Sequence, residues 1–421
     1  MSRAGFCRSL AVVAAAVAAA APCGSRAAPD ISGQLRPQWA EQTANARSPL
    51  AQADALAPGI AERPGSGPQV ETELRASGHG VNAVVTLQAQ RLAGEGIKTH
   101  AHLNELAASA DGAGWQLSAG KKIVAWDVGY GFRPNDVVAQ EARRTLLAVT
   151  PEGRPLLMAE HFDARTAWAL VIVNPTRPRD QRGAEEPALA VRAFRQDGAV
   201  DWHGFARFGA HTGASLGAAA AWVASESVEL HASARGFARA DTLANTAEGR
   251  DLRQVDPWQA ASVHRGVQAL IGGTWTNADQ LSLLAEAWWD GTALSDAAWS
   301  RWNARNELLD GLAQTQSDTP ALMPAVAGNL AWQADAFGAS QSLRRANLFA
   351  RLSWQHDKWQ PAIDLLLTPA DRGRIVTGSV AWQGDRVRID SGVRVYGGPS
   401  SAVLAQLPVR RVVYLAGTWA F

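Results

Sequence analysis

The chain contains almost no cysteine, because Cys7 and Cys23 are its only two thiols and both lie close to the N-terminus. Beyond them the sequence offers nothing for a disulfide or for a zinc site built on thiolates. Past the N-terminal region it also lacks any run of about 18 consecutive apolar residues, which excludes a conventional transmembrane helix. Tyrosine is scarce as well, with 3 residues against 17 tryptophans.

The N-terminal region has the pattern of a secretory signal peptide. Arg3 and Arg8 precede the apolar run "SLAVVAAAVAAAAPCG", and the small-residue stretch "SRA" follows it. We expect cleavage near Ala27, which leaves residues 28–421 as one domain and removes both cysteines. Cleavage would also lower the Lys+Arg count from 40 to 37 against 39 Asp+Glu, a net charge of about −2. Nothing in this balance indicates a nucleic-acid partner.

Most of the remaining chain consists of segments of roughly ten residues in which apolar and polar residues alternate, separated by Gly, Asp, Asn and Pro. In "DRVRIDSGVRVY" valines and an isoleucine occupy one face, and charged residues occupy the other. The same division recurs in "NAVVTLQAQ", "VELHASARGF" and "ANLFARLSWQ". If these strands surround a water-filled lumen, the residues predicted to line it are Arg207, Arg235, Arg351, Arg386, Arg388, Asp390 and Arg394.

Alternation alone is also compatible with a soluble β-sandwich. Three features favour an all-β transmembrane antiparallel β-barrel: the many charges on one face, the excess of tryptophan, and the aromatic last residue. Nineteen segments can be counted, but bacterial single-chain barrels have an even number of strands. We therefore predict 18 strands, with 16 as the alternative. The tryptophans expected in interfacial girdles are Trp126, Trp202, Trp222, Trp289, Trp354, Trp359, Trp382 and Trp419.

The chain ends in "VVYLAGTWAF", an alternating stretch that closes on an aromatic residue. It resembles the last strand of Gram-negative outer-membrane β-barrels of the porin superfamily, which ends in a C-terminal Phe. The resemblance implies an outer-membrane location and an assembly signal that includes Tyr414, Trp419 and Phe421. The partners it implies are outer-membrane lipid, the barrel-insertion machinery and periplasmic chaperones.

Residues 117–144, "LSAGKKIVAWDVGYGFRPNDVVAQEARR", are similar to a stretch of alginate-export-type substrate-specific porins, from which Lys121 and Asp127 depart. Independently of that resemblance, the glycines and the proline of "DVGYGFRPND" interrupt a strand. The following "DVVAQEARR" indicates a short helix capped by Asn135 or Asp136. We predict that this insertion folds into the lumen and narrows it. The candidate constriction residues are Asp127, Arg133, Asp136, Glu141, Arg143 and Arg144.

Four longer irregular stretches predict external loops, at residues 43–68, 174–187, 239–261 and 291–325, and short turns are expected at "SADGAG", "TNAD" and "QGDR". Residues 296–313 predict a helix whose Trp299 and Trp302 pack on a rim.

No catalytic constellation accompanies these features. His100 and His102 share a strand face, but no third ligand stands at a convincing spacing, so we predict no metal site and no cofactor. The pattern favours a passive outer-membrane channel for small polar or anionic solutes, and not an enzyme. The alternatives are a dedicated export or assembly barrel that acts with periplasmic partners and, less favoured, an outer-membrane enzyme.

Overall fold

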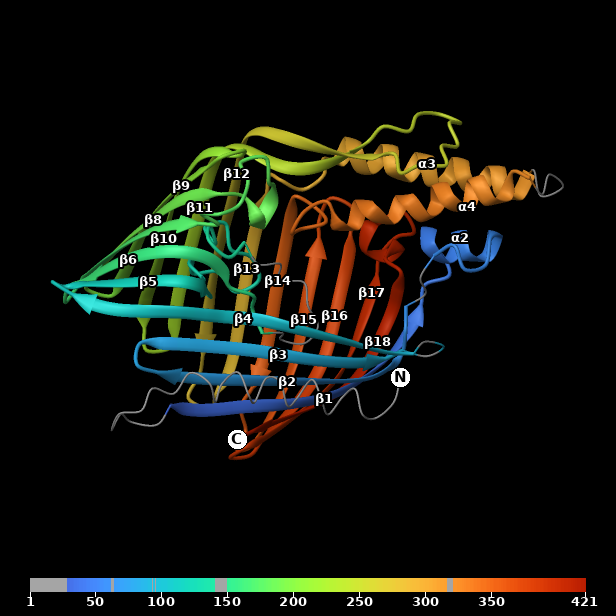
Figure 1. Ribbon diagram of the computed structural model, residues 1–421. Helices are drawn as coiled ribbons and strands as arrows, with labels where there is room; N and C mark the ends of the chain where they lie inside the picture. Colours follow the sequence, from blue (N-terminus) through green and yellow to red (C-terminus); the bar gives the residue numbers. More distant parts are fainter. Residues whose placement is uncertain (1–28, 62–63, 93, 95, 141–149, 316–320) are drawn as a thin grey trace.

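The computed structural model describes residues 29–61, 64–92, 94, 96–140, 150–315 and 321–421. The predicted signal peptide lies outside them. The described residues form a single 18-stranded antiparallel sheet in which each strand pairs with its neighbours in the chain (Figure 1). β1 pairs with β2 on one side and with β18 on the other, so the sheet closes into a barrel and no strand edge is left open. The prediction of 18 strands is confirmed.

The strands differ in length, and the longest pair is β11 and β12. The first nine are β1 (Asp30–Ala44), β2 (Gly67–Gly78), β3 (Val81–Arg91), β4 (Ile97–Gly112), β5 (Trp115–Lys122), β6 (Arg154–Phe162), β7 (Thr166–Val173), β8 (Ala188–Asp197) and β9 (Val200–Gly209). The other nine are β10 (Gly213–Ser225), β11 (Val228–Asn245), β12 (Trp258–Thr276), β13 (Leu281–Asp290), β14 (Ala346–Trp354), β15 (Trp359–Thr368), β16 (Gly373–Gln383), β17 (Val387–Gly397) and β18 (Val409–Ala420).

Side chains alternate between the two faces of the wall, as the sequence predicts. In β17 the apolar residues point outward, where Ile389 is 43% exposed and Val393 39% exposed, while Arg388 and Asp390 on the opposite face are half-buried. An apolar outer face suits lipid and a charged inner face suits water.

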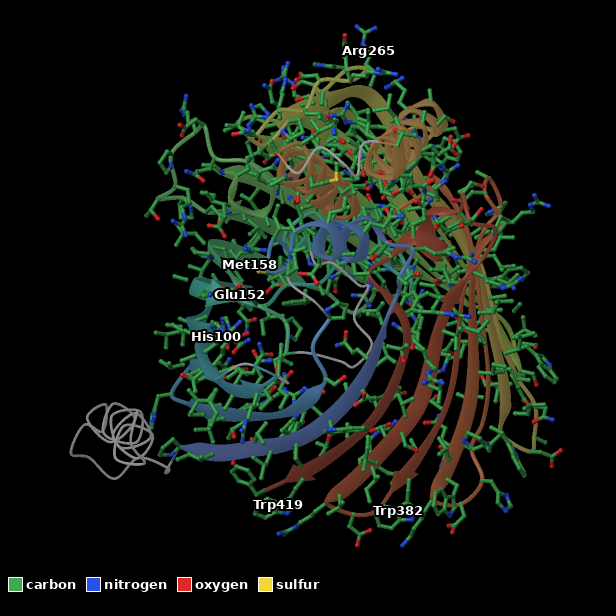
Figure 2. The ribbon with its side chains drawn as sticks, turned by 90° about the vertical axis from the view of Figure 1, so that its right-hand side faces the viewer. His100, Glu152, Met158, Arg265, Trp382 and Trp419 are labelled. Carbon is green, nitrogen blue, oxygen red and sulfur yellow. The ribbon has the colours of Figure 1, made fainter. Side chains whose placement is uncertain are left out.

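Six of the eight predicted girdle tryptophans are large exposed side chains: Trp202, Trp222, Trp289, Trp354, Trp359 and Trp419. Trp382 is half-buried and lies with Trp419 toward the same end of the barrel (Figure 2). The prediction for Trp126 is wrong, because this side chain is 4% exposed and packs inside the barrel against Phe205.

The connections differ at the two ends of the barrel. At one end they are tight turns such as Ala113–Gly114, where both residues have positive φ. At the other end are long connections, including the predicted loops. The predicted loop 239–261 is shorter than predicted, because β11 and β12 continue to pair out to Asn245 and Trp258. Residues 246–257 form the irregular connection, and the residues on either side of it belong to a two-stranded ribbon.

Helices from the long connections gather at that end of the barrel (Figure 1). They are α2 (Pro49–Leu56), α3 (Asp296–Thr315) and α4 (Met323–Trp332), with the short 3-10 helices η1 (Gly183–Glu185), η2 (Gln333–Gly338) and η3 (Val403–Gln406). The helix predicted at 296–313 is confirmed as α3. Trp299 and Trp302 pack edge to face, with ring centroids 5.3 Å apart, in an apolar cluster with Val403 and Leu404. No helix in the described part of the chain is long and apolar enough to cross a membrane.

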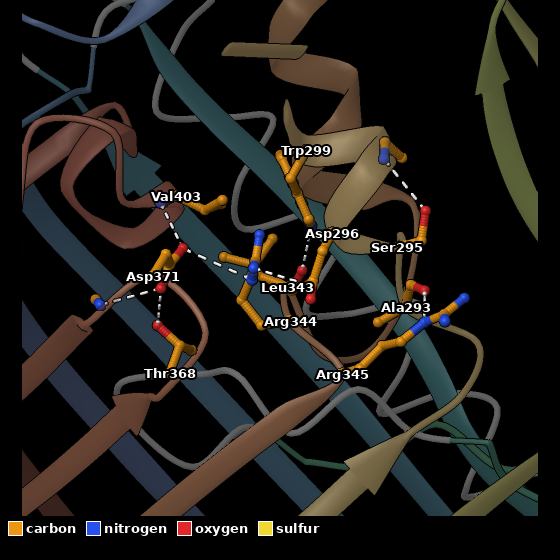
Figure 3. Close-up of polar contacts among 12 residues, drawn as sticks. Ala293, Ser295, Asp296, Trp299, Leu343, Arg344, Arg345, Thr368, Asp371 and Val403 are labelled. Carbon is orange, nitrogen blue, oxygen red and sulfur yellow. Dashed lines mark hydrogen bonds and ion pairs between the residues drawn. The ribbon is translucent and has the colours of Figure 1, made fainter. Parts of the chain in front are cut away.

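Polar contacts fasten this helical cap to the barrel (Figure 3). The Nη2 group of Arg344 donates to Asp296 Oδ1 at 2.9 Å, where α3 begins. The carboxylate of Asp371 accepts from Thr368 Oγ1 at 2.6 Å and from the backbone N–H of Val403 at 3.0 Å. Arg344 Nε also lies 3.7 Å from Asp371 Oδ2, so these contacts join the β13–β14, β15–β16 and β17–β18 connections, which are far apart in the sequence.

Candidate functional site

Residues 123–140, which we call the inward segment, leave the sheet after β5 and run along the inner side of the barrel (Figure 1). Asp127 adopts a φ of 101°, which is strained for a residue with a side chain. Its carboxylate accepts from the backbone N–H groups of Val128 at 2.8 Å and Asn135 at 2.5 Å, so it closes the segment on itself. The prediction of an insertion that folds inward is consistent with this placement.

The helix predicted for residues 136–144 is wrong in its described part. Residues 137–139 form a turn, and residues 141–149 lie outside the described residues. Asn135 does not cap a helix, because its side-chain amide donates to Ser233 Oγ at 2.9 Å and to Ala234 O at 3.1 Å on the barrel wall. These bonds pull the chain onto β11 and hold it there.

An apolar cluster anchors the two ends of the inward segment. Trp126, Val137 and Val138 are nearly inaccessible to solvent and pack on the inner face of neighbouring strands. The inner wall is apolar where the inward segment covers it, whereas a wall that faces water would be polar. The wall residues in the cluster are Leu156, Met158, Ala169, Val171, Val173, Ala188, Ala190, Phe205 and Ala219.

This covered wall has a signal in the sequence that alternation alone does not reveal. The stretch "TAWALVIV" of β7 is apolar on both faces: Leu170 and Ile172 are 45% and 44% exposed outward, while Val171 and Val173 are at most 1% exposed inward. A strand that is apolar on both faces, inside an otherwise alternating barrel, indicates a wall that something covers from within.

Glu286 on β13 holds the tip of the inward segment. Its two carboxylate oxygens accept from the backbone N–H groups of Tyr130 at 2.6 Å and Gly131 at 2.7 Å, and Oε1 lies 3.0 Å from His231 Nε2. A Cβ added at Gly131 would lie 3.1 Å from Glu286 Oε2, so a side chain there would crowd the contact. Phe132 stacks on Trp288, with ring centroids 5.8 Å apart. These contacts of Glu286 were not predicted from the sequence.

Arg207 and Arg235 were predicted to line the lumen, and the structure corrects this. Arg207 is 1% exposed; its Nη1 donates to Val137 O at 2.7 Å and its Nη2 to Glu186 Oε2 at 2.9 Å. Arg235 Nη1 lies 3.5 Å from Pro134 O. The inward segment covers both guanidinium groups, which therefore act as anchors for its backbone.

Glu186 balances the buried charge of Arg207. Burial by itself raises the pKa of Glu186, but hydrogen bonds from Thr212 and Arg207 outweigh that effect and hold the pKa below its usual value. The pair is ionised at neutral pH, so Arg207 adds no net positive charge to the lumen.

The other predicted lumen charges lie on the wall opposite the covered strands. Arg388 is paired with Asp390 at 2.8 Å, and Arg351 with Asp364 at 3.1 Å. Arg394 is half-buried and its Nε donates to Thr377 Oγ1 at 2.9 Å. Arg386 is exposed in the turn before β17 and is not part of a strand. Their role in permeation stays a prediction.

A second group of charges, which was not predicted as a site, lies on the inner face of β1 and β2. Arg36 Nη2 is 2.6 Å from Glu71 Oε1 and 2.8 Å from Glu73 Oε2, and Arg75 Nε is 2.5 Å from Glu73 Oε1. The side chain of Arg75 is 55% exposed. This part of the inner wall is therefore charged, with its positive and negative groups paired. Arg75 reaches water, whereas Glu71 and Glu73 are buried.

Of the six predicted constriction residues, the structure describes three. Asp136 is buried, Asp127 is half-buried with its carboxylate bonded to the backbone of the inward segment, and Arg133 Nε donates to Gly129 O at 2.8 Å, so none of the three extends as an isolated charge into the lumen. The other three, Glu141, Arg143 and Arg144, lie outside the described residues.

The residues of the predicted assembly signal divide between the two faces of β18. Trp419 and Phe421 are each 47% exposed on the outer face with ring centroids 5.3 Å apart, whereas Tyr414 is 7% exposed on the inner face. The backbone of Phe421 exchanges two hydrogen bonds with Gly33, at 2.9 and 3.0 Å. The last residue thus completes the ladder between β18 and β1.

His100 and His102 lie side by side on β4, with ring centroids 6.3 Å apart. In the described part of the chain, no group of three or more His, Cys, Asp or Glu side chains could hold a metal ion.

Comparison with known proteins gives similarity at the level of the fold. OccAB1 of Acinetobacter baumannii has a TM-score of 0.52 and 9% identity, over 93% of this chain and 96% of that one. OccK5 (OpdH) of Pseudomonas aeruginosa has a TM-score of 0.51 and 7% identity, over 93% and 98%. The chain has the fold of the Occ outer-membrane barrels. A mutant of Rh. blastica porin aligns with a TM-score of 0.44 and 10% identity, over 94% and 100%. No family model matches the sequence, and no curated protein does.

Proposed function

We propose that this porin-type barrel is a passive channel in the outer membrane of a Gram-negative bacterium and admits small polar or anionic solutes. The observation that carries the proposal is the inward segment, which lies inside a closed 18-stranded barrel and is fixed to its inner wall by Glu286 and Asn135. A barrel of this size encloses a lumen, and an ordered segment within it restricts which solutes pass.

The distribution of polarity supports the same proposal. The outer face carries exposed apolar residues, whereas the inner wall away from the inward segment carries ion pairs whose side chains reach water, as Arg75 and Arg388 do with 55% and 40% exposure. Charged groups lining a lumen act on permeating ions through their local field. Because most of the described inner charges are paired, we expect only a mild preference for anions.

We further propose that the chain reaches this location as a secreted precursor cleaved near Ala27, and that residues 28–421 form one barrel domain. The barrel-insertion machinery and periplasmic chaperones would then recognise the terminal strand, whose outer face presents Trp419 and Phe421.

Conductance of the purified protein in a planar lipid bilayer tests the proposed function. We expect stepwise current increases that scale with salt concentration, and passage of small neutral solutes into liposomes with a cut-off in size. A correctly folded barrel that inserts but carries no current would contradict a passive channel, and would favour an export barrel that needs its partner or an enzyme.

A further inference from the structure

A pocket of about 460 Å³ lies between the tip of the inward segment and the inner face of β11–β15. Its floor is continuous across four strands, because the register pairs Glu229 with Thr274, Thr274 with Leu284, and Leu284 with Arg351. Val128 and Tyr130 of the inward segment form the facing side. The volume is in the range of sites that bind small molecules.

The charges at the pocket do not favour an anion. His231 is held between two carboxylates, with Nδ1 3.3 Å from Glu229 and Nε2 3.0 Å from Glu286. Arg351 Nη1 lies 3.1 and 3.3 Å from the two oxygens of Asp364. Two basic side chains therefore face three carboxylates. Because negative groups already outnumber positive ones at the pocket, binding of an anionic ligand is disfavoured.

The polar groups that remain include both donors and acceptors. Within the described part of the chain, the side chains of Thr274, Ser353 and Gln360 make no hydrogen bond to another residue, and neither do Nε and Nη2 of Arg351. Hydroxyl and amide groups can donate or accept, the guanidinium only donates, and Glu229 only accepts. This mixture matches a ligand whose own groups both donate and accept, as hydroxyl groups do.

Tyr130 supplies an aromatic surface beside these groups. Its side chain is 51% exposed, and its ring is backed by Phe349 with centroids 6.0 Å apart and an interplanar angle of 20°. The backbone N–H of Tyr130 is fixed by Glu286, so the ring has a defined position in the lumen. An exposed, supported aromatic face next to mixed donors and acceptors suits a sugar ring, which has apolar C–H faces and hydroxyl edges.

We propose that this pocket is a binding subsite for a neutral sugar, a mono- or disaccharide, with its ring on Tyr130 and its hydroxyl groups on Arg351, Gln360 and Glu229. The inference rests on the proposed channel function and specifies one solute class for it. It places a sugar beside the inward segment, where a bound molecule obstructs ion flow.

Block of single-channel current tests this subsite with maltose as the probe. Maltose added to the native channel in KCl should reduce the current in a saturable way. Tyr130→Ala should weaken this block about fivefold through loss of the aromatic contact. Tyr396→Ala is the matched control, since Tyr396 also lies on the inner face but outside the pocket, and its maltose block should equal that of the native channel.

Gln360→Leu, which keeps a similar volume, is a second variant that should weaken the maltose block without touching the inward segment. A uronic acid should block less than the neutral sugar. Native conductance without any maltose block would overturn the subsite while leaving the channel intact, whereas a silent barrel would overturn both. An amino sugar that blocks tenfold more strongly than the neutral sugar would assign the pocket to cations, and equal block by the uronic acid would also reject the proposal.

Discussion

Removing the carboxylate of Glu286 should release the tip of the inward segment. In the native protein this side chain accepts two backbone N–H groups, those of Tyr130 and Gly131, at 2.6 and 2.7 Å. Hydrogen bonds to a charged group contribute about 1.5–3 kcal/mol each. Glu286→Ala therefore destabilises the attached tip by about 3 kcal/mol even at the lower limit, which raises the population of the detached tip on the order of a hundredfold.

The remaining anchors, Asn135 and the apolar cluster around Trp126, are untouched by this change and should keep the ends of the inward segment in place. The expected result is a channel whose open current fluctuates more than that of the native channel and whose mean conductance is higher. Glu286→Gln keeps one acceptor oxygen and should have a smaller effect in the same direction. Single-channel recording in a planar bilayer measures both quantities.

Glu226→Gln is the matched control, because Glu226 is exposed in a short turn at the opposite end of the barrel from the cap. It should leave current noise and conductance unchanged. The reasoning is refuted if Glu286→Ala folds to a heat-modifiable barrel and conducts with native noise and native amplitude. That result would show that the tip is held by contacts other than the carboxylate.

Three further predictions concern assembly, selectivity and pH. Phe421→Glu should reduce the amount of heat-modifiable barrel in outer membranes, since it places a charge at the lipid-facing end of the terminal strand; undiminished assembly would remove Phe421 from the predicted signal. In a salt gradient the native channel should show a mild anion preference, and changing Arg386, Arg388 and Arg394 together to Gln should move the reversal potential toward that of a cation channel; an unmoved potential would place these residues outside the conduction pathway. Burial in the helical cap raises the pKa of Asp310, so the Asp310 carboxyl group binds its proton more tightly in the folded cap than in the unfolded chain. Protonation of Asp310 therefore stabilises the cap at low pH, and this stabilisation is lost as pH rises through the raised pKa. Hydrogen exchange of the α3 amides should therefore slow as pH falls through that range, after correction for intrinsic exchange, and Asp310→Asn should flatten the change; an unaltered pH profile in the variant would contradict this role.

The sequence by itself was sufficient to predict the wall of the barrel. Period-two alternation depends on neighbouring residues, so the outward valines of β17 and the inward Arg388 could be assigned to faces without knowing any partner strand. The even-number rule for closed barrels led to 18 strands. The helix α3 could also be predicted from local sequence, because its helix-forming residues lie in one continuous stretch.

What lies inside the barrel was decided only by the tertiary structure. Glu286 meets Tyr130 across 156 residues of chain, and Arg207 meets Val137 across 70, so no local pattern could pair them. The sequence pattern around an inward arginine is the same whether its side chain is exposed to water or covered by a segment of the chain. Closure of the barrel and the path of the inward segment decide between these two cases, and both features depend on contacts between distant strands. For that reason the alternation could place Arg388 and Arg394 on the inner face, while the partners of the inner charges, and the residues that hold the inward segment, could not be predicted.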